Sequence, residues 1–95
     1  MREDIAGMVA VSRAGRDRGR GLVAIAAEGD GYVLVADGRL RRLARPKRKK
    51  LKHLAFTGER IDLGSMPGDT GCADAFIRRE LSRLGYKDNT ASEEG

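Results

Sequence analysis

Aromatic residues and cysteine are scarce in this sequence. Aromatic residues make up 4% of the 95 residues and Trp is absent, so we expect a core of Val, Ile, Leu and Ala. Cys72 is the only cysteine and His53 the only histidine. This excludes an intrachain disulfide and a Cys/His zinc site within the chain, and it indicates a reducing compartment. No run of about 18 apolar residues is present, so we expect no segment that spans a membrane.

Targeting and catalytic signals are missing as well. The N-terminal stretch MREDIAGMVAV contains acidic residues and no long apolar region, so we expect no secretory signal and a cytoplasmic protein. Neither GxxxxGK(S/T) nor GxGxxG, two patterns that bind nucleotide phosphates, is found, and no nucleophile motif occurs. We therefore expect a protein that is not an enzyme and that uses no metal, cofactor or small-molecule substrate.

Positive charge is concentrated in one stretch of the chain. The segment 39-RLRRLARPKRKKLKH-53 holds nine Lys or Arg residues and no Asp or Glu. The whole chain has 19 basic and 14 acidic residues, a net charge of +5, whereas the rest of the chain without this segment has a net charge of −4. A local cationic surface of this kind attracts nucleic acid, an anionic membrane or an acidic protein.

The N-terminal half has the pattern of short β-strands. Alternating apolar residues or β-forming residues predict three strands, at Met8–Arg13, Leu22–Glu28 and Tyr32–Ala36. Asp37-Gly38 is typical of a hairpin turn, so we expect a fourth strand at Arg39–Ala44. A last short strand is anchored by Leu51, Leu54 and Phe56. Strands so short and closely spaced predict a small β-barrel over residues 1–57.

The C-terminal half differs in character. Residues 58–71 are rich in Gly and predict a flexible linker. Residues 72–85 predict a helix, which Asp69 or Thr70 can cap and whose apolar residues are Ala73, Phe76, Ile77, Leu81 and Leu84. This helix either docks on the barrel or is reserved for a partner protein. Residues 86–95 are polar and acidic, and we expect a disordered tail.

Two stretches of the sequence resemble a known family. The stretch 7-GMVAVSRAGRDRGRGLVAI-25 resembles the KOW motif, a strand, a basic glycine-containing loop and a second strand. The continuation 32-YVLVADGRLRRLARPKRKKLKHL-54 resembles bacterial KOW-domain RNA-binding proteins, which are related to an archaeal and eukaryotic large-subunit ribosomal protein family. The resemblance covers about residues 5–56 and does not include the helix.

The resemblance implies an SH3-like barrel that binds RNA through its loops. It places Val23 and Ile25 in the second strand of the motif, and it assigns the motif's loop to Gly15, Arg16, Asp17, Arg18, Gly19 and Arg20. Together with the basic segment, the loop supplies the candidate RNA-binding residues: Arg13, Gly15, Arg16, Arg18, Gly19, Arg20, Arg41, Arg42, Arg45, Lys47, Arg48, Lys49, Lys50 and Lys52.

The scarcity of aromatic residues affects the expected mode of binding. Proteins that read single strands stack bases on aromatic rings, and none of the aromatic residues lies within the basic segment. We therefore expect contacts to the phosphates of folded RNA. The resemblance implies ribosomal RNA as that target, with ribosomal or translation-associated proteins as further candidate partners.

Other interpretations of the same features remain open. Small barrels of this shape also bind proteins, so a protein-interaction module in transcription or translation complexes is the main alternative. The segment PKRKKLK also resembles a nuclear localisation signal. A membrane-surface role needs a basic amphipathic helix, which Pro46 precludes within the basic segment, so we expect no membrane partner.

Overall fold

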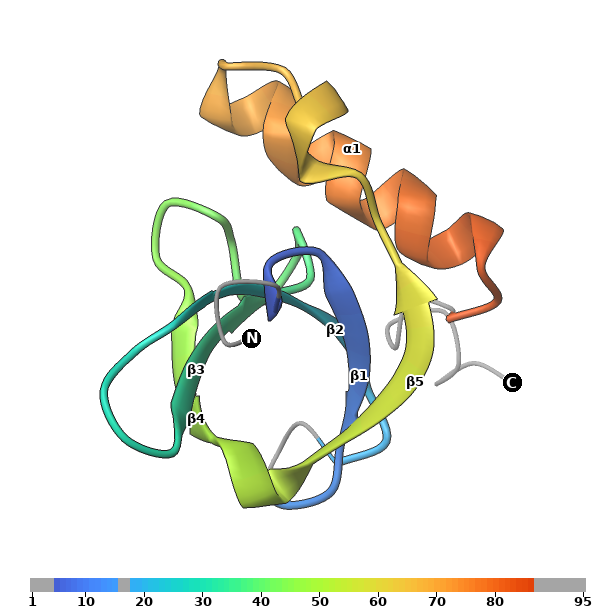
Figure 1. Cartoon of the computed structure of the whole chain (residues 1–95). Helices are drawn as coiled ribbons and strands as arrows, with labels where there is room; N and C mark the ends of the chain where they lie inside the picture. The colour runs from blue at the N-terminus through green and yellow to red at the C-terminus, as the bar shows by residue number, and fades with distance from the viewer. Residues whose placement is uncertain (1–4, 16–17, 87–95) are drawn as a thin grey trace.

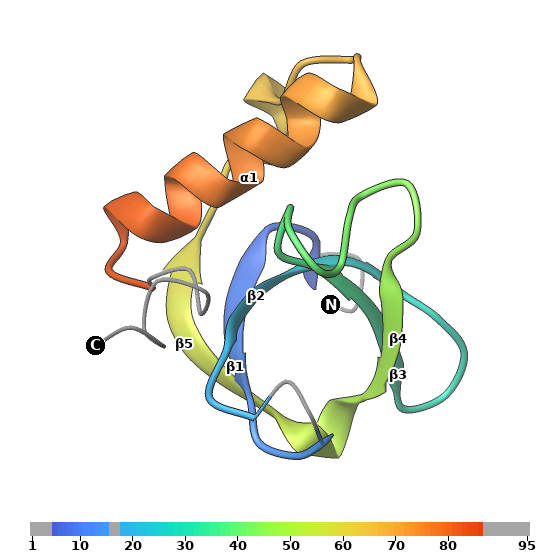
Figure 2. The ribbon, with the colours of Figure 1, turned by 180° about the vertical axis from the view of Figure 1, so that it is seen from behind.

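The computed structural model describes residues 5–15 and 18–86 (Figure 1). Its five strands are antiparallel neighbours in the order β4-β3-β2-β1-β5, with the bounds β1 Met8–Ser12, β2 Gly21–Ala27, β3 Tyr32–Ala36, β4 Lys47–Lys50 and β5 Leu54–Arg60. The sheet curls into a ring, and helix α1 (Thr70–Arg83) lies outside it (Figures 1 and 2). The predicted fold class, mainly β with a small barrel-like sheet and a C-terminal helix, is confirmed.

Two apolar clusters lie on the two faces of the curled sheet. Strand β2 contributes to both, because its successive side chains point to opposite faces. Leu22 and Ala24 face the inside of the ring, in the cluster Ala10, Leu22, Ala24, Val33, Val35 and Leu54. Val23 faces outward and packs against α1, in the cluster Val9, Val23, Ala36, Ile61, Ile77 and Leu81. The helix therefore covers the outer surface of β1 and β2.

The fourth strand is not where the sequence analysis predicted it. Arg39–Ala44 is not a strand; the strand is β4, Lys47–Lys50, within the basic segment itself. The reason is Asp37, whose Oδ1 accepts hydrogen bonds from the backbone N–H groups of Arg39 at 2.8 Å and Arg41 at 2.9 Å. These bonds fold the chain into a turn directly after β3, so the extended conformation resumes only after Pro46.

The segment after β4 also differs from the predicted domain boundaries. A short 3-10 helix, η3 (Leu51–His53), leads into β5, which continues to Arg60, beyond the boundary predicted at residue 57. Ile61 is 2% exposed and belongs to the cluster beneath α1, so the predicted flexible linker, residues 58–71, contains a residue that packs in the core. A second 3-10 helix, η4 (Leu63–Ser65), follows.

Helix α1 begins two residues earlier than predicted and docks on the sheet. The side chain of Asp69 accepts a hydrogen bond from the backbone N–H of Cys72 at 3.1 Å, the arrangement of an N-cap. Ala73, Ile77 and Leu81 are buried, which confirms the docked alternative for this helix. Of the predicted tail, Tyr86 is half-buried and ordered against the sheet; residues 87–95 lie outside the described part of the chain.

Candidate nucleic-acid interface

Strand β4 and the β1–β2 loop meet through Lys49. Lys49 pairs with Val33 of β3, and its side chain faces the inside of the ring with 8% exposure. Its ammonium group donates a hydrogen bond to the carbonyl oxygen of Ala14 in the loop, at 3.3 Å. A Cβ placed on Gly15 would lie 3.9 Å from the same nitrogen. Lys49 therefore connects the basic segment to the loop that resembles the KOW motif.

A second contact joins the loop to the end of the basic segment. The backbone N–H of Arg13 donates to the carbonyl oxygen of His53, the last residue of η3, at 2.8 Å. Lys52 lies in the same short helix and is exposed. The loop thus lies beside both β4 and η3, which together carry the lysine-rich end of the basic segment.

The outward face of β4 carries cations next to an aromatic ring. Arg48 is neighbour to Leu34 on β3, and Lys50 is neighbour to Tyr32. The Arg48 guanidinium lies over the Tyr32 ring, 3.7 Å from its centroid, and its Nε is 3.4 Å from Oε1 of Glu28. Because the ring and the carboxylate hold it, Arg48 is an ordered cation; its side chain is still 54% exposed.

The predicted basic residues divide into exposed and enclosed ones. The exposed ones are Arg13, Arg18, Arg42, Arg45, Lys47, Arg48, Lys50 and Lys52. Arg41 is half-buried, and Arg20 and Lys49 are enclosed. Arg16 and Asp17 lie outside the described residues. The structure therefore presents most, but not all, of the predicted cations on the surface.

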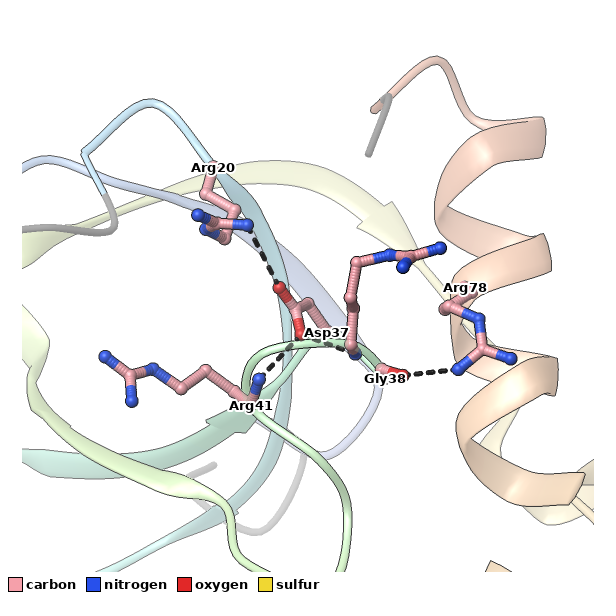
Figure 3. Close-up of polar contacts among 6 residues, drawn as sticks. Arg20, Asp37, Gly38, Arg41 and Arg78 are labelled. Atoms are coloured by element: carbon pink, nitrogen blue, oxygen red, sulfur yellow. Dashed lines mark hydrogen bonds and ion pairs between the residues drawn. The ribbon is translucent and has the colours of Figure 1, made fainter. Parts of the chain in front are cut away.

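Arg20 serves to tie two connections together. Its side chain is 11% exposed, and its Nη1 is 3.6 Å from Oδ2 of Asp37, which is 7% exposed (Figure 3). Asp37 also accepts from the turn that follows β3, so one carboxylate links the end of the β1–β2 loop to the β3–β4 connection. Sequence reasoning assigned Asp37 only to a hairpin turn and overlooked this pairing.

The glycines of the loop have the conformations that the prediction required. Gly15 has φ of 76° and Gly19 has φ of 84°, values that other residues rarely adopt. The backbone N–H of Gly19 donates to the carbonyl oxygen of Ser12 at 2.8 Å, and a Cβ placed on Gly19 would meet nothing within 4 Å. Its backbone is exposed, so another molecule can approach it closely.

Tyr32 lies beside the basic strand β4. Sequence reasoning missed this neighbour because the contact depends on the register between β3 and β4.

Cys72 is exposed, but a hydrogen bond with Asp69 and the negative charge of that carboxylate raise the pKa of its thiol. A thiol with a raised pKa is a poor nucleophile at neutral pH.

Within residues 5–15 and 18–86, no group of three or more His, Cys, Asp or Glu side chains is placed to hold a metal ion. In the same residues, no helix has both the length and the apolar character needed to cross a bilayer.

No model of a known protein family matches the sequence, and no curated protein matches it either.

Proposed function

We propose that this protein binds folded RNA through phosphate contacts made by the β1–β2 loop, β4 and η3. The observation that carries the proposal is the pair of contacts from Lys49 to Ala14 and from Arg13 to His53, which bring the two basic parts of the sequence side by side. Cations from both parts can then contact one stretch of phosphate backbone. Ribosomal RNA in the cytoplasm is the target that the resemblance to KOW-domain proteins favours.

The exposed cations and the enclosed cations have different roles in the proposed binding. Arg18, Lys47, Arg48 and Lys50 are exposed and are the proposed phosphate ligands, together with the other exposed basic residues. Arg20 and Lys49 hold the loop in position. Arg48 covers one face of the Tyr32 ring, so that face is not open to a stacked base. These features support recognition of backbone and shape in preference to base sequence.

The salt dependence of binding tests this proposal. If about five cations neutralise phosphates, log K falls with log salt concentration at a slope near −4. The double variant K47Q/K50Q should reduce the steepness of that slope by roughly two, because two phosphate contacts are lost. Affinity should fall to a similar extent for RNA hairpins of different sequence.

A matched control comes from elsewhere on the surface. The variant R60Q/R83Q removes the same charge from β5 and α1, where both residues are exposed. Its salt slope should equal that of the wild type. Equal slopes for both double variants would exclude β4 from the interface. Cellular partners that remain bound after RNase treatment, with no binding to RNA hairpins, would favour the protein-interaction alternative.

A further inference from the structure

A cleft lies between one side of helix α1 and the curled sheet, away from β4 and η3. Its volume is about 350 Å³, within the roughly 300–1,000 Å³ that is usual for small-molecule sites. The charged residues that line it are Arg20, Asp37, Arg39, Arg78 and Arg79. Figure 3 shows Arg20 and Asp37 on the sheet side and Arg78 on the helix, with Gly38 between them.

The charge of this cleft is strongly positive. Among residues 5–15 and 18–86, four arginines line it, and the one carboxylate in its lining is that of Asp37. That carboxylate already faces Arg20 and accepts hydrogen bonds from two backbone N–H groups. The neighbouring acids are also occupied, because Glu80 pairs with Arg83 and Asp74 accepts from the backbone N–H of Leu43. The cleft therefore attracts an anion.

Arg78 is held in place for such an anion. Its Nη1 donates to the carbonyl oxygen of Gly38 at 2.5 Å. Gly38 has φ of 81°, and a side chain there would collide with the backbone oxygen of Asp74, so the turn can approach the helix this closely only with glycine. A guanidinium has five donor hydrogens, and one bond to Gly38 leaves the others for a ligand. Phosphate oxygens suit the forked geometry of arginine.

The other wall of the cleft is apolar and aromatic. Tyr86 and Leu81 line it, and Leu81 is 4% exposed. The ring of Tyr86 packs directly on Gly21, where a Cβ would lie 2.8 Å from the ring's Cγ. Its hydroxyl donates to Oε1 of Glu59 at 2.8 Å, which fixes the ring from its far end. A fixed aromatic ring next to a cluster of arginines suits a ligand that has both a flat apolar part and a phosphate.

We propose that this cleft binds a nucleoside 5′-phosphate, with the phosphate among the arginines and the base against Tyr86. The ligand is either a free mononucleotide or the phosphorylated 5′ end of an RNA strand, and only the second form rests on the proposed function. Arg20 joins the two sites, because it ends the β1–β2 loop and lines the cleft.

Calorimetric titration of the whole protein tests this inference. The ligands are adenosine 5′-monophosphate, adenosine, inorganic phosphate and a phosphoserine peptide. The mononucleotide should bind about tenfold more tightly than adenosine or phosphate alone, because each lacks one half of the contacts. Adenosine or phosphate that binds as tightly as the mononucleotide would overturn the proposal, as would tighter binding of the peptide.

Two variants localise the binding. R79Q removes a cation that lines the cleft and is exposed, and it should weaken mononucleotide binding about tenfold. R83Q removes a cation from the same helix that does not line the cleft, and binding should be unchanged. Y86L should weaken binding of the mononucleotide but not of inorganic phosphate. Equal affinities for R79Q and R83Q would place any binding outside the cleft.

RNA oligomers distinguish the two sources of the ligand. A short RNA with a 5′-phosphate that binds more tightly than the same RNA with a 5′-hydroxyl, and loses this advantage in R79Q, identifies the strand end. Equal binding of both oligomers, with tight binding of the mononucleotide, identifies the free nucleotide. A reduced salt slope in K47Q/K50Q together with no mononucleotide binding would overturn this inference and leave the proposed function intact. An unchanged salt slope together with mononucleotide binding that R79Q weakens would support this inference and overturn the proposed function.

Discussion

The ammonium nitrogen of Lys49 lies 3.3 Å from the carbonyl oxygen of Ala14, so a residue of β4 that faces the inside of the ring holds the β1–β2 loop. Residues 14 and 49 are distant in the sequence, and the stem of the lysine runs beside Val33 to connect them. Burying an ammonium group costs free energy unless polar partners accept its hydrogens. The hydrogen bond to Ala14 offsets this cost, and it also fixes the position of the β1–β2 loop relative to β4.

The first prediction concerns this link. Lys49→Met keeps the length and apolar stem of the side chain but removes the donor to Ala14. We expect the loop to open more often, by about 1 kcal/mol, so that the Gly19 amide exchanges hydrogen roughly fivefold faster. Exchange of individual amides measured by NMR spectroscopy checks this. Lys50→Met is the control, because Lys50 is exposed on the outward face; equally fast exchange in both variants would contradict the role of Lys49.

The second prediction concerns Gly19. Its φ of 84° disfavours a side chain, so Gly19→Val should destabilise the loop by about 1–2 kcal/mol without any change of charge. RNA affinity should fall while the salt slope stays the same, since no phosphate ligand is removed. Gly68→Val is the matched control, because Gly68 has no positive φ and open space around it. If Gly19→Val bound RNA as tightly as the wild type, the loop would only connect β1 to β2 and would not contribute to binding.

The sequence was sufficient to predict the strands whose pattern is local. Strands β1, β2 and β3 alternate apolar residues or consist of β-formers, and the loop between β1 and β2 has glycines where positive φ is needed. The C-terminal helix was predicted from its apolar spacing, and Asp69, one of the two candidates named for its cap, is the residue that caps it. Each of these signals is contained within a few neighbouring residues.

The features that were missed depend on contacts between distant residues. Strand β4 has the sequence KRKK, which shows no apolar alternation, because the buried member is a lysine whose stem is apolar and whose ammonium reaches Ala14. The cleft arises where Arg78 of α1 meets Gly38 of the β3–β4 connection. Neither the pairing partner of Lys49 nor that of Arg78 can be deduced from neighbouring residues in the sequence.

The third prediction tests whether α1 belongs to the folded unit. Ile77 is fully buried between the helix and the sheet, so Ile77→Ala should lower the free energy of unfolding by about 2–5 kcal/mol. Urea denaturation followed by circular dichroism measures this. Leu40→Ala is the control; Leu40 is 56% exposed, and its loss should cost less than about 0.5 kcal/mol. Similar values for both variants would mean that the helix does not contribute to the core.

The last prediction concerns the ionisation of Tyr86. The hydrogen bond that its hydroxyl donates to Glu59 raises the pKa of Tyr86 above the ordinary value of 10.0, because a phenolate cannot donate and would face a carboxylate. A hydrogen bond with Thr57 acts in the opposite direction but does not reverse the shift. Because the pKa is higher in the folded state, the resulting stabilisation is complete below a pH of about 10 and is lost as the pH rises through the folded-state pKa.

Titration of tyrosinate absorbance measures this shift directly. Tyr32 and Tyr86 are the only tyrosines, so a Tyr32→Phe background leaves Tyr86 as the single titrating phenol. In that background Glu59→Gln should lower the pKa of Tyr86, because the amide carries no charge to oppose the phenolate. Glu28→Gln removes a carboxylate that faces Arg48 instead, and the midpoint should not move. If Glu59→Gln left the midpoint where it was, Glu59 would not be the group that holds the Tyr86 ring on Gly21, and the aromatic wall of the cleft would need another support.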